Sequence, residues 1–307
     1  MNWQILELVL ISVVMAATPL VIAAVGELVT ERAGVLNLGV EGMMIVGASA
    51  GFAAAILSGS SLIGVLVGVL AGCALSAIFG ILVIFFAANQ VATGLALTIL
   101  GVGMSGLIGS GFVGLKRESI AHLDIPVLSE LPVVGRLIFG QDPFVYSSLA
   151  LVVAVSWFLN QTRAGLTLRA VGENHASAHA LGLPVRRIRM LSVLFGGACA
   201  GLAGAYLSLA YTPFWAPGMT AGRGWIALAL VVFASWKPFR AYGGALLFGG
   251  ATVLQLHAQA ASIGLPGQLL TAVPYLATII ALVILSLHTK RGSVAPASLG
   301  IPFVPER

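Results

Sequence analysis

Polar side chains that could bind a solute occur at three places in a chain that is otherwise almost entirely apolar. The first place is the segment GELVTERAGVLNLGVEGMM (26–44), which carries Asn37 and Glu41. A carboxylate at the centre of a bilayer costs about 2.5–3.5 kcal/mol on insertion scales, so an intramembrane Glu41 must face protein or a wet cavity. The segment is therefore either an ordinary turn in the cytoplasm or a functional break at membrane depth.

The second place is the polar start of ANQVATGLALTILGVG (88–103), where Asn89 and Gln90 precede an apolar run and Thr93 lies one turn beyond Asn89. These side chains could contact a solute. Asn is also a good N-cap, and capping would satisfy the free N–H groups at a helix start without any ligand. The two interpretations are equally compatible with the pattern.

The third place is the pair Gln255 and Gln259, which are one helical turn apart and therefore share a face. They could line a path for a solute, but hydrogen bonding between membrane helices is the commoner use of such residues. No predicted span contains Lys or Arg, which an anionic solute would need to offset its desolvation. The interior therefore suits an uncharged polar solute such as a sugar or a nucleoside.

Motifs for enzymatic chemistry and for metal binding are absent from the sequence. None of the lysines, Lys116, Lys237 and Lys290, follows a glycine, so a G-x-x-x-x-G-K-[ST] phosphate loop is excluded and ATP hydrolysis would need a partner. The histidines and carboxylates form no catalytic or metal-binding constellation. An ion-coupled secondary transporter is a rival interpretation, but it usually has paired charges inside spans, and here only Glu7 and Glu41 are available.

The elements that position these residues are predicted to be membrane helices. Hydrophobic residues make up 59% of the chain and charged residues 8%, against roughly a quarter charged in soluble domains. A helix needs about 20 apolar residues to cross a bilayer. We predict an all-α, polytopic membrane protein with a single domain over 1–307 and about nine spans, with eight to ten possible. The spans are expected near 5–25, 38–57, 62–86, 91–113, 144–160, 190–210, 225–236, 241–260 and 273–287.

Small residues recur at intervals of four within several of these spans, and the chain contains 38 glycines. Such stripes let helix backbones approach closely, which is how helices associate in lipid. We therefore assign them to packing and not to a solute path. The stripes are Gly64, Gly68, Gly72, Ser76 and Gly80, then Gly101, Ser105 and Gly109, and then Gly197, Gly201 and Ala205.

The distribution of basic residues predicts the orientation. The loop 161–189 contains five arginines against one glutamate, whereas 114–143 contains more acidic than basic residues. Positively charged loops stay in the cytoplasm, which places 161–189 and the C-terminus inside and the N-terminus outside. The net charge of +5 reflects this topology and gives no indication of nucleic-acid binding. The tail 288–307 is expected to be a flexible cytoplasmic segment.

Within this loop, RAVGENHASAHALGLPVRRIR (169–189) is too polar to cross the membrane and is rich in helix-favouring alanine between Gly172 and Gly182. It predicts a short surface helix. Such a helix could dock another subunit, or it could be a solvated connector with arginines that set the topology.

Gly172-Glu173-Asn174 followed by Ala180-Leu181-Gly182 resembles the coupling-helix loop of ABC importer permeases of the branched-chain amino acid, ribose and simple-sugar superfamily. The segments 26–44, 88–103 and GRGWIALALVVFASWKP (222–238) resemble permeases for nucleoside or simple-sugar uptake. The resemblance covers residues 20–285. One departure is that His175 stands where proline is frequent, with His179 on the same helix face.

The resemblance implies a permease subunit in the bacterial inner (plasma) membrane that works with a second permease, the same chain or a paralogue. ABC ATPase subunits would bind ATP and Mg and dock on the coupling loop, and an extracytoplasmic solute-binding protein would deliver the solute. We therefore expect import of a neutral polar solute, with a nucleoside first and a simple sugar or branched-chain amino acid as alternatives. The expected coupling residues are Gly172, Glu173, Asn174, Ala180, Leu181 and Gly182, and the expected solute-path residues are Asn37, Glu41, Asn89, Gln90, Thr93, Gln255 and Gln259.

Overall fold

The computed structural model describes residues 3–123, 135–260 and 295–304, together with a few single helical positions between 269 and 283. The described part is helical, as predicted, and its only β-type pairing is an isolated bridge between Lys116 and Phe214. Six helical segments are long and apolar enough to cross a membrane, and each coincides with a predicted span. They are Ile5–Arg32, Val40–Ser58, Ser61–Phe85, Gln90–Phe112, Pro143–Gln161 and Val185–Tyr211.

The first half of the chain forms four long helices. They are α1 (Trp3–Arg32), α2 (Val40–Ser58), α3 (Ser61–Gly80), which continues as a π-helical turn over Ile81–Phe85, and α4 (Gln90–Gly109), which ends in a 3₁₀ turn over Ser110–Phe112. The short α5 (Gly135–Phe139) then leads to α6 (Pro143–Gln161). The Asp142 carboxylate caps α6 by accepting hydrogen bonds from the Phe144 and Val145 amides, and Pro143 at the first helical position needs no such partner.

The second half contains two short helices, α7 (Arg163–Glu173) and α8 (His175–Ala180), and then the long α9 (Val185–Tyr206), which ends in a π-helical turn over Leu207–Tyr211. The predicted span at 225–236 is the 11-residue helix α10 (Arg223–Phe233), and the span predicted at 241–260 is α11 (Pro238–Ala260). The predicted span at 273–287 lies largely outside the described residues.

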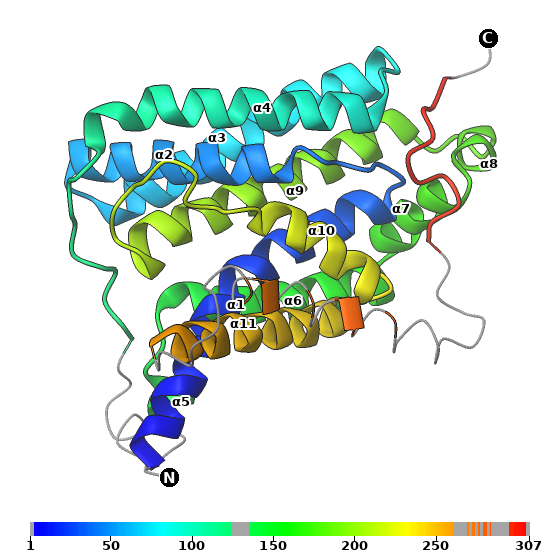
Figure 1. The fold of residues 1–307 in the computed structure, drawn as a ribbon. Helices are drawn as coiled ribbons and strands as arrows, with labels where there is room; N and C mark the ends of the chain where they lie inside the picture. The colour runs from blue at the N-terminus through cyan, green and yellow to red at the C-terminus, as the bar shows by residue number, and fades with distance from the viewer. Residues whose placement is uncertain are drawn as a thin grey trace.

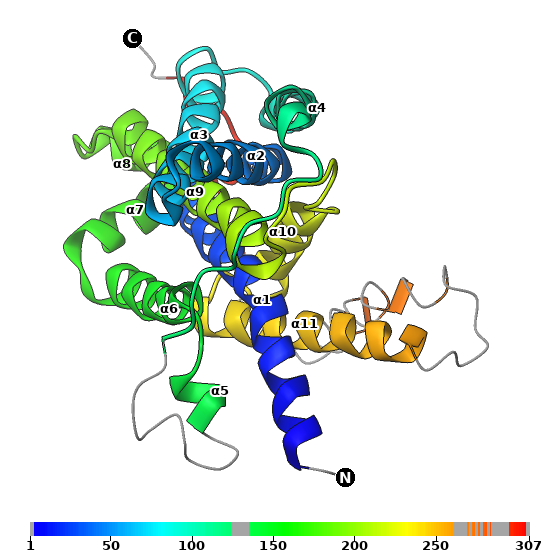
Figure 2. The same ribbon diagram turned by 90° about the vertical axis from the view of Figure 1, so that its left-hand side faces the viewer.

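Helix α1 runs through the middle of the molecule, with α2, α3, α4 and α9 on one side and α6 and α11 on the other (Figures 1 and 2). The tightest packing joins α2, α3 and α9 through the predicted small-residue stripes. A Cβ atom at Gly72 would lie 2.7 Å from the Cα atom of Gly201, so only glycine permits this approach. The stripes therefore serve packing, as predicted.

Candidate functional site

The chain between α1 and α2 is a buried break. Helix α1 continues to Arg32, so Glu27 and Glu31 lie within the helix and not in a loop. The following turn is held by side chains of the protein: the Asn37 amide donates to Glu27 Oε1 at 3.1 Å, and the Gly39 amide donates to Asn37 Oδ1 at 2.9 Å. The segment 26–44 is therefore not a solvated turn with snorkelling ends, because its polar groups face the protein interior.

Helix α4 supplies further partners for this break. Gln90 is buried, and its Oε1 accepts a hydrogen bond from the Leu36 amide at 2.8 Å. The Thr98 hydroxyl donates to the Leu38 carbonyl at 3.0 Å. The predicted motif 88–103 thus satisfies backbone groups that the break leaves without helical partners.

Glu41, in the first turn of α2, holds the start of α10. Its Oε1 accepts from the Thr220 hydroxyl at 2.6 Å and from the Gly222 amide at 2.9 Å, and its Oε2 accepts from the Gly224 amide at 2.6 Å. The side chain is 6% exposed. A carboxylate in this place satisfies free N–H groups at a helix N-terminus and interacts favourably with the helix dipole.

The other end of α10 is held by the end of α1. The Trp236 indole donates to Glu31 Oε2 at 2.6 Å, and the Arg32 guanidinium donates to the Trp236 carbonyl through Nε and Nη2. Two carboxylate oxygens in this region, Glu27 Oε2 and Glu31 Oε1, are buried and have no hydrogen-bond partner within the described part of the chain. The segments 26–44 and 222–238 are therefore joined at both ends of the short helix.

The predicted short surface helix is present as α8. Asn174 caps it, with its Oδ1 accepting from the Ser177 amide at 2.9 Å, and Gly182 ends the turn at a φ of +81°. Glu173, Ala180 and Leu181 are exposed, and Leu181 has an exposed fraction of 81%. This arrangement leaves one face of α8 available to a partner.

Two contacts connect the segment 169–189, called the coupling segment from here on, to the break between α1 and α2. Gly172 lies directly against Arg32, so that a Cβ atom at position 172 would overlap the Arg32 carbonyl oxygen. Arg189 is 2% exposed, and its Nε donates to the Ala33 carbonyl at 3.2 Å. Arg189 was grouped with the loop arginines on sequence grounds, but the structure places it inside α9 as a structural link.

The C-terminal segment 295–304 packs against α7 and α8, in contrast to the flexible tail expected for 288–307. The Ser298 amide donates to the Gly172 carbonyl at 2.9 Å, and Arg189 Nη1 donates to the Ile301 carbonyl at 3.0 Å. Phe303 is buried, and its ring meets those of His175 and His179 edge-on, with centroids 5.4 and 5.3 Å apart. Backbone hydrogen bonds and a buried ring therefore hold 295–304 in place.

His175 and His179, which were noted above as a departure from the usual loop pattern, thus pack against the Phe303 ring. His175 Nδ1 also lies 3.2 Å from Arg189 Nη2. Burial, and then the positive charge of Arg189, lower the pKa of His175 below its ordinary value. The neutral imidazole is therefore the form that fits this contact.

The remaining residues predicted for a solute path do not join this cluster. Asn89 is exposed and caps α4 by accepting from the Ala92 amide at 3.0 Å, and Thr93 is half-buried in the same turn, where its amide donates to the Asn89 carbonyl. Gln255 and Gln259 are half-buried near the C-terminal end of α11, and this end of the helix lies far from the break (Figure 1). Of the predicted set, the structure brings together Asn37, Glu41 and Gln90.

Thr220, Trp236, Thr98 and Arg189 were not predicted as members of the cluster. Trp236 and Thr98 lie within the motifs 222–238 and 88–103, but their hydrogen-bond partners are far away in the sequence. A sequence pattern with a period of one turn cannot show such contacts.

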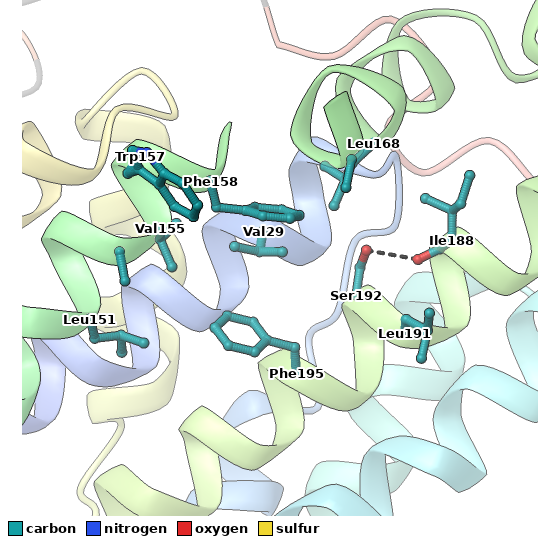
Figure 3. Close-up of a pocket in the computed structure, with 12 residues that line it drawn as sticks. Val29, Leu151, Val155, Trp157, Phe158, Leu168, Ile188, Leu191, Ser192 and Phe195 are labelled. Atoms are coloured by element: carbon teal, nitrogen blue, oxygen red, sulfur yellow. Dashed lines mark hydrogen bonds between the residues drawn. The ribbon is translucent and has the colours of Figure 1, made fainter. Parts of the chain in front are cut away.

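A cavity of about 470 Å³ lies between α1, α6, α7 and α9, next to the coupling segment (Figure 3). Its lining is apolar, with Phe158, Phe195 and Leu168 pointing into it, and the Ser192 hydroxyl on its wall already donates to the Ile188 carbonyl at 2.8 Å. This lining offers an uncharged polar solute almost no hydrogen bonds.

Comparison with known proteins assigns a class to this architecture. Residues 9–288 match the family described as the permease component of branched-chain amino acid transport systems. The chain is 46% identical to a putative glucose ABC transporter permease of Haloferax volcanii, over 82% of this chain and 78% of the relative. It is 32% identical to a guanosine ABC transporter permease of Bacillus subtilis over 98% of both chains. It is 31% identical to a nucleoside ABC transporter permease of Lactococcus lactis over 97% of both chains.

Proposed function

The chain belongs to the permease family of branched-chain amino acid transport systems, and from this membership and the buried break we propose that it imports a nucleoside by ATP-driven alternating access. It is an ABC transporter permease of the simple-sugar and nucleoside type and a multi-pass protein of the inner (plasma) membrane. The resemblance found in the sequence is thereby confirmed at the level of the family.

The choice of a nucleoside rests on the relatives and on the chemistry of the interior. The guanosine and nucleoside permeases match this chain over almost its whole length. The polar groups around the break are amides, hydroxyls, carboxylates and the guanidinium groups of Arg32 and Arg189, which donate to backbone carbonyls. The carboxylate of Glu41 is already saturated by donors. A simple sugar is the second candidate, because the putative glucose permease has the higher identity.

The observation that carries the proposed mechanism is the convergence of three separate segments on one buried break. The coupling segment contacts the break through Gly172 and Arg189, and the break in turn holds α4 through Gln90 and the start of α10 through Glu41. A displacement of α8 would therefore be passed to α2, α4 and α10 as one unit. A two-state rearrangement of this unit is what alternating access requires.

The partners follow from the family in general and complete the proposal. ABC ATPase subunits bind ATP and Mg and dock on the exposed Glu173, Asn174, Ala180, Leu181 and Gly182 of the coupling segment. Gly172 is buried against Arg32 and connects this surface to the break. A second permease, either a copy of this chain or a paralogue, completes the membrane unit. An extracytoplasmic solute-binding protein delivers the solute.

The docking role is tested by Leu181→Ala, Glu173→Arg and Gly182→Pro in the complete transporter reconstituted in vesicles. We expect loss of ATPase association and of solute-stimulated ATP hydrolysis. Leu107→Ala is the matched control, because Leu107 is a leucine of similar exposure, 79%, on a different helix. Unchanged association and transport in the coupling variants would refute the docking role.

The solute is tested separately by uptake of radiolabelled guanosine and glucose into cells that contain the complete transporter. We expect saturable guanosine uptake that excess unlabelled nucleoside suppresses and excess glucose does not. Uptake of glucose alone would refute the nucleoside assignment and leave the coupling mechanism in place.

A further inference from the structure

A second cavity, of about 480 Å³, lies where α1, α6, α7 and the connection from α10 to α11 meet. Four basic residues from three places in the chain line it: Arg32, Arg169, Lys237 and Arg240. Ser156 and Asn160 of α6 add polar groups, and Trp236 forms part of its wall. The cavity differs in this respect from the apolar one in Figure 3, which lies on a neighbouring part of α6 and α7.

The positive charge at this cavity exceeds the negative charge nearby. Glu31 lies behind Trp236 and already accepts the indole N–H, and Glu173 of α7 is the carboxylate that interacts with Arg32. Among the described residues that line the cavity, four are cations and none is a carboxylate. The like charges of Arg32 and Arg169 repel each other. An anion in the cavity would relieve this repulsion.

A specific donor is also left without a partner. The Nε atom of Arg169 is buried and has no hydrogen-bond acceptor within the described residues. A buried donor that is not satisfied is costly, and a guanidinium matches the geometry of a phosphate group. The cavity thus combines excess positive charge with guanidinium groups whose geometry suits a phosphate.

The position of the cavity indicates where the anion comes from. Arg32 and Gln161 are the last residues of the membrane-crossing segments of α1 and α6, so the cavity lies at helix ends on the side predicted to be cytoplasmic. Phe239 at its rim is 60% exposed, and Trp157 on the adjacent turn of α6 is 62% exposed. Aromatic residues beside cations are typical of the boundary between lipid and water.

We propose that this cavity binds the phosphate headgroup of an anionic phospholipid from the inner leaflet. Basic pockets between membrane helices on the cytoplasmic side are suited to such headgroups. The bound phosphate lies between Arg169 of the coupling segment and the cations of α1 and the α10–α11 connection. It therefore joins α7 to the two elements that hold the ends of the break.

The test measures lipid retention by native mass spectrometry of the full chain, released from detergent after exchange with phosphatidylglycerol or phosphatidylcholine. We expect wild type to retain phosphatidylglycerol in preference to phosphatidylcholine. The double variant Arg169→Gln/Arg240→Gln should weaken that retention at least tenfold. The control is Arg163→Gln/Arg187→Gln, which removes the same charge at two exposed arginines outside the cavity and should retain the lipid.

The remaining outcomes distinguish the sources of the phosphate. If inorganic phosphate at millimolar concentration displaces the lipid from wild type, the site is for a soluble anion and the lipid assignment is wrong. Equal loss in the control variant would show unspecific attraction to surface charge, and a variant that keeps the lipid but loses ATPase association would show a protein-docking surface. Lys237→Gln, at an exposed position, replaces the double variant if the latter fails to fold, and should also weaken retention.

Discussion

Replacement of Glu41 by glutamine tests whether this carboxylate holds helix α10 in place. The substitution keeps the size of the side chain but puts an NH₂ group where one carboxylate oxygen accepts hydrogen bonds. If the new NH₂ group takes the position of Oε2, it faces the backbone N–H of Gly224, which in the wild type donates to Oε2 at 2.6 Å. If it replaces Oε1, it faces both Thr220 and the Gly222 amide.

The less costly orientation fixes the size of the effect. Loss of one hydrogen bond to a charged group costs about 1.5–3 kcal/mol. Loss of a carboxylate at a helix N-terminus adds about 0.3–1 kcal/mol. Together these give about 2–4 kcal/mol, which corresponds to a roughly 30- to 1000-fold increase in local opening at the start of α10.

Amide hydrogen exchange over residues 222–226, measured by mass spectrometry in nanodiscs, reads this opening directly. We expect exchange there to accelerate within that range, and the midpoint of thermal unfolding to fall. Glu7→Gln is the matched control, because Glu7 lies half-buried in the second turn of α1, away from the break. Exchange over 222–226 that is identical in Glu41→Gln and wild type would show that the carboxylate does not hold the helix.

Three further predictions concern the coupling segment. Gly172→Ala should lower the ratio of solute transported to ATP hydrolysed and reduce the thermal midpoint, since the added methyl group overlaps the Arg32 carbonyl and overpacking costs about 1–3 kcal/mol. A normal transport ratio in that variant would argue against force transfer through this contact. Phe303→Ala should expose 295–304 to limited proteolysis, because it removes the buried ring of that segment, whereas Val304→Ala, at 67% exposure, should not; equal protection of both would contradict the packing. Burial is the larger cause that lowers the pKa of His175, and Phe303 of the packed segment contributes to that burial, so His175 binds a proton less readily when 295–304 is packed than when it is released. The segment 295–304 should be fully packed above the ordinary histidine pKa of about 6.5, and its packing should weaken as the pH falls below that value. Amide hydrogen exchange over 295–304 at pH 7.5 and 5.5 measures this effect. The substitution His175→Gln should remove the pH dependence.

The long helices could be predicted because their signal is local. Six of the nine predicted spans coincide with helices of membrane-crossing length in the described residues, and the glycine stripes were correctly assigned to packing. The end of α1 could not be predicted in this way, because Glu27, Glu31 and Arg32 look like loop residues until their buried partners are known. Trp236, which engages Glu31 and Arg32, lies about 200 positions further along the chain.

Two features near the coupling segment could not be predicted from the sequence, the burial of Arg189 and the packing of 295–304. The positive-inside rule counts arginines by position in the sequence, so it could not separate the buried Arg189 from its exposed neighbour Arg187. The tail was expected to be flexible because it is a chain terminus, but the Phe303 ring, which lies between two histidines, and backbone hydrogen bonds hold 295–304 in place. The position of a segment in the chain does not show which of its side chains is buried.

The length of α10 explains why the acidic segment 26–44 exists in an otherwise apolar chain. A helix of 11 residues is about 16 Å long, roughly half of what is needed to cross the hydrocarbon core. If α10 lies at membrane depth, the free backbone groups of at least one of its ends must find hydrogen-bond partners inside the protein. Glu41 accepts hydrogen bonds from amides at the first end, and Glu31 and Arg32 hydrogen-bond Trp236 just beyond the last end. A solute could reach the Glu41 carboxylate only by displacing the α10 amides. We therefore expect Glu41 to influence transport by positioning α10, so that its substitution changes the rate of transport more than the affinity for the solute.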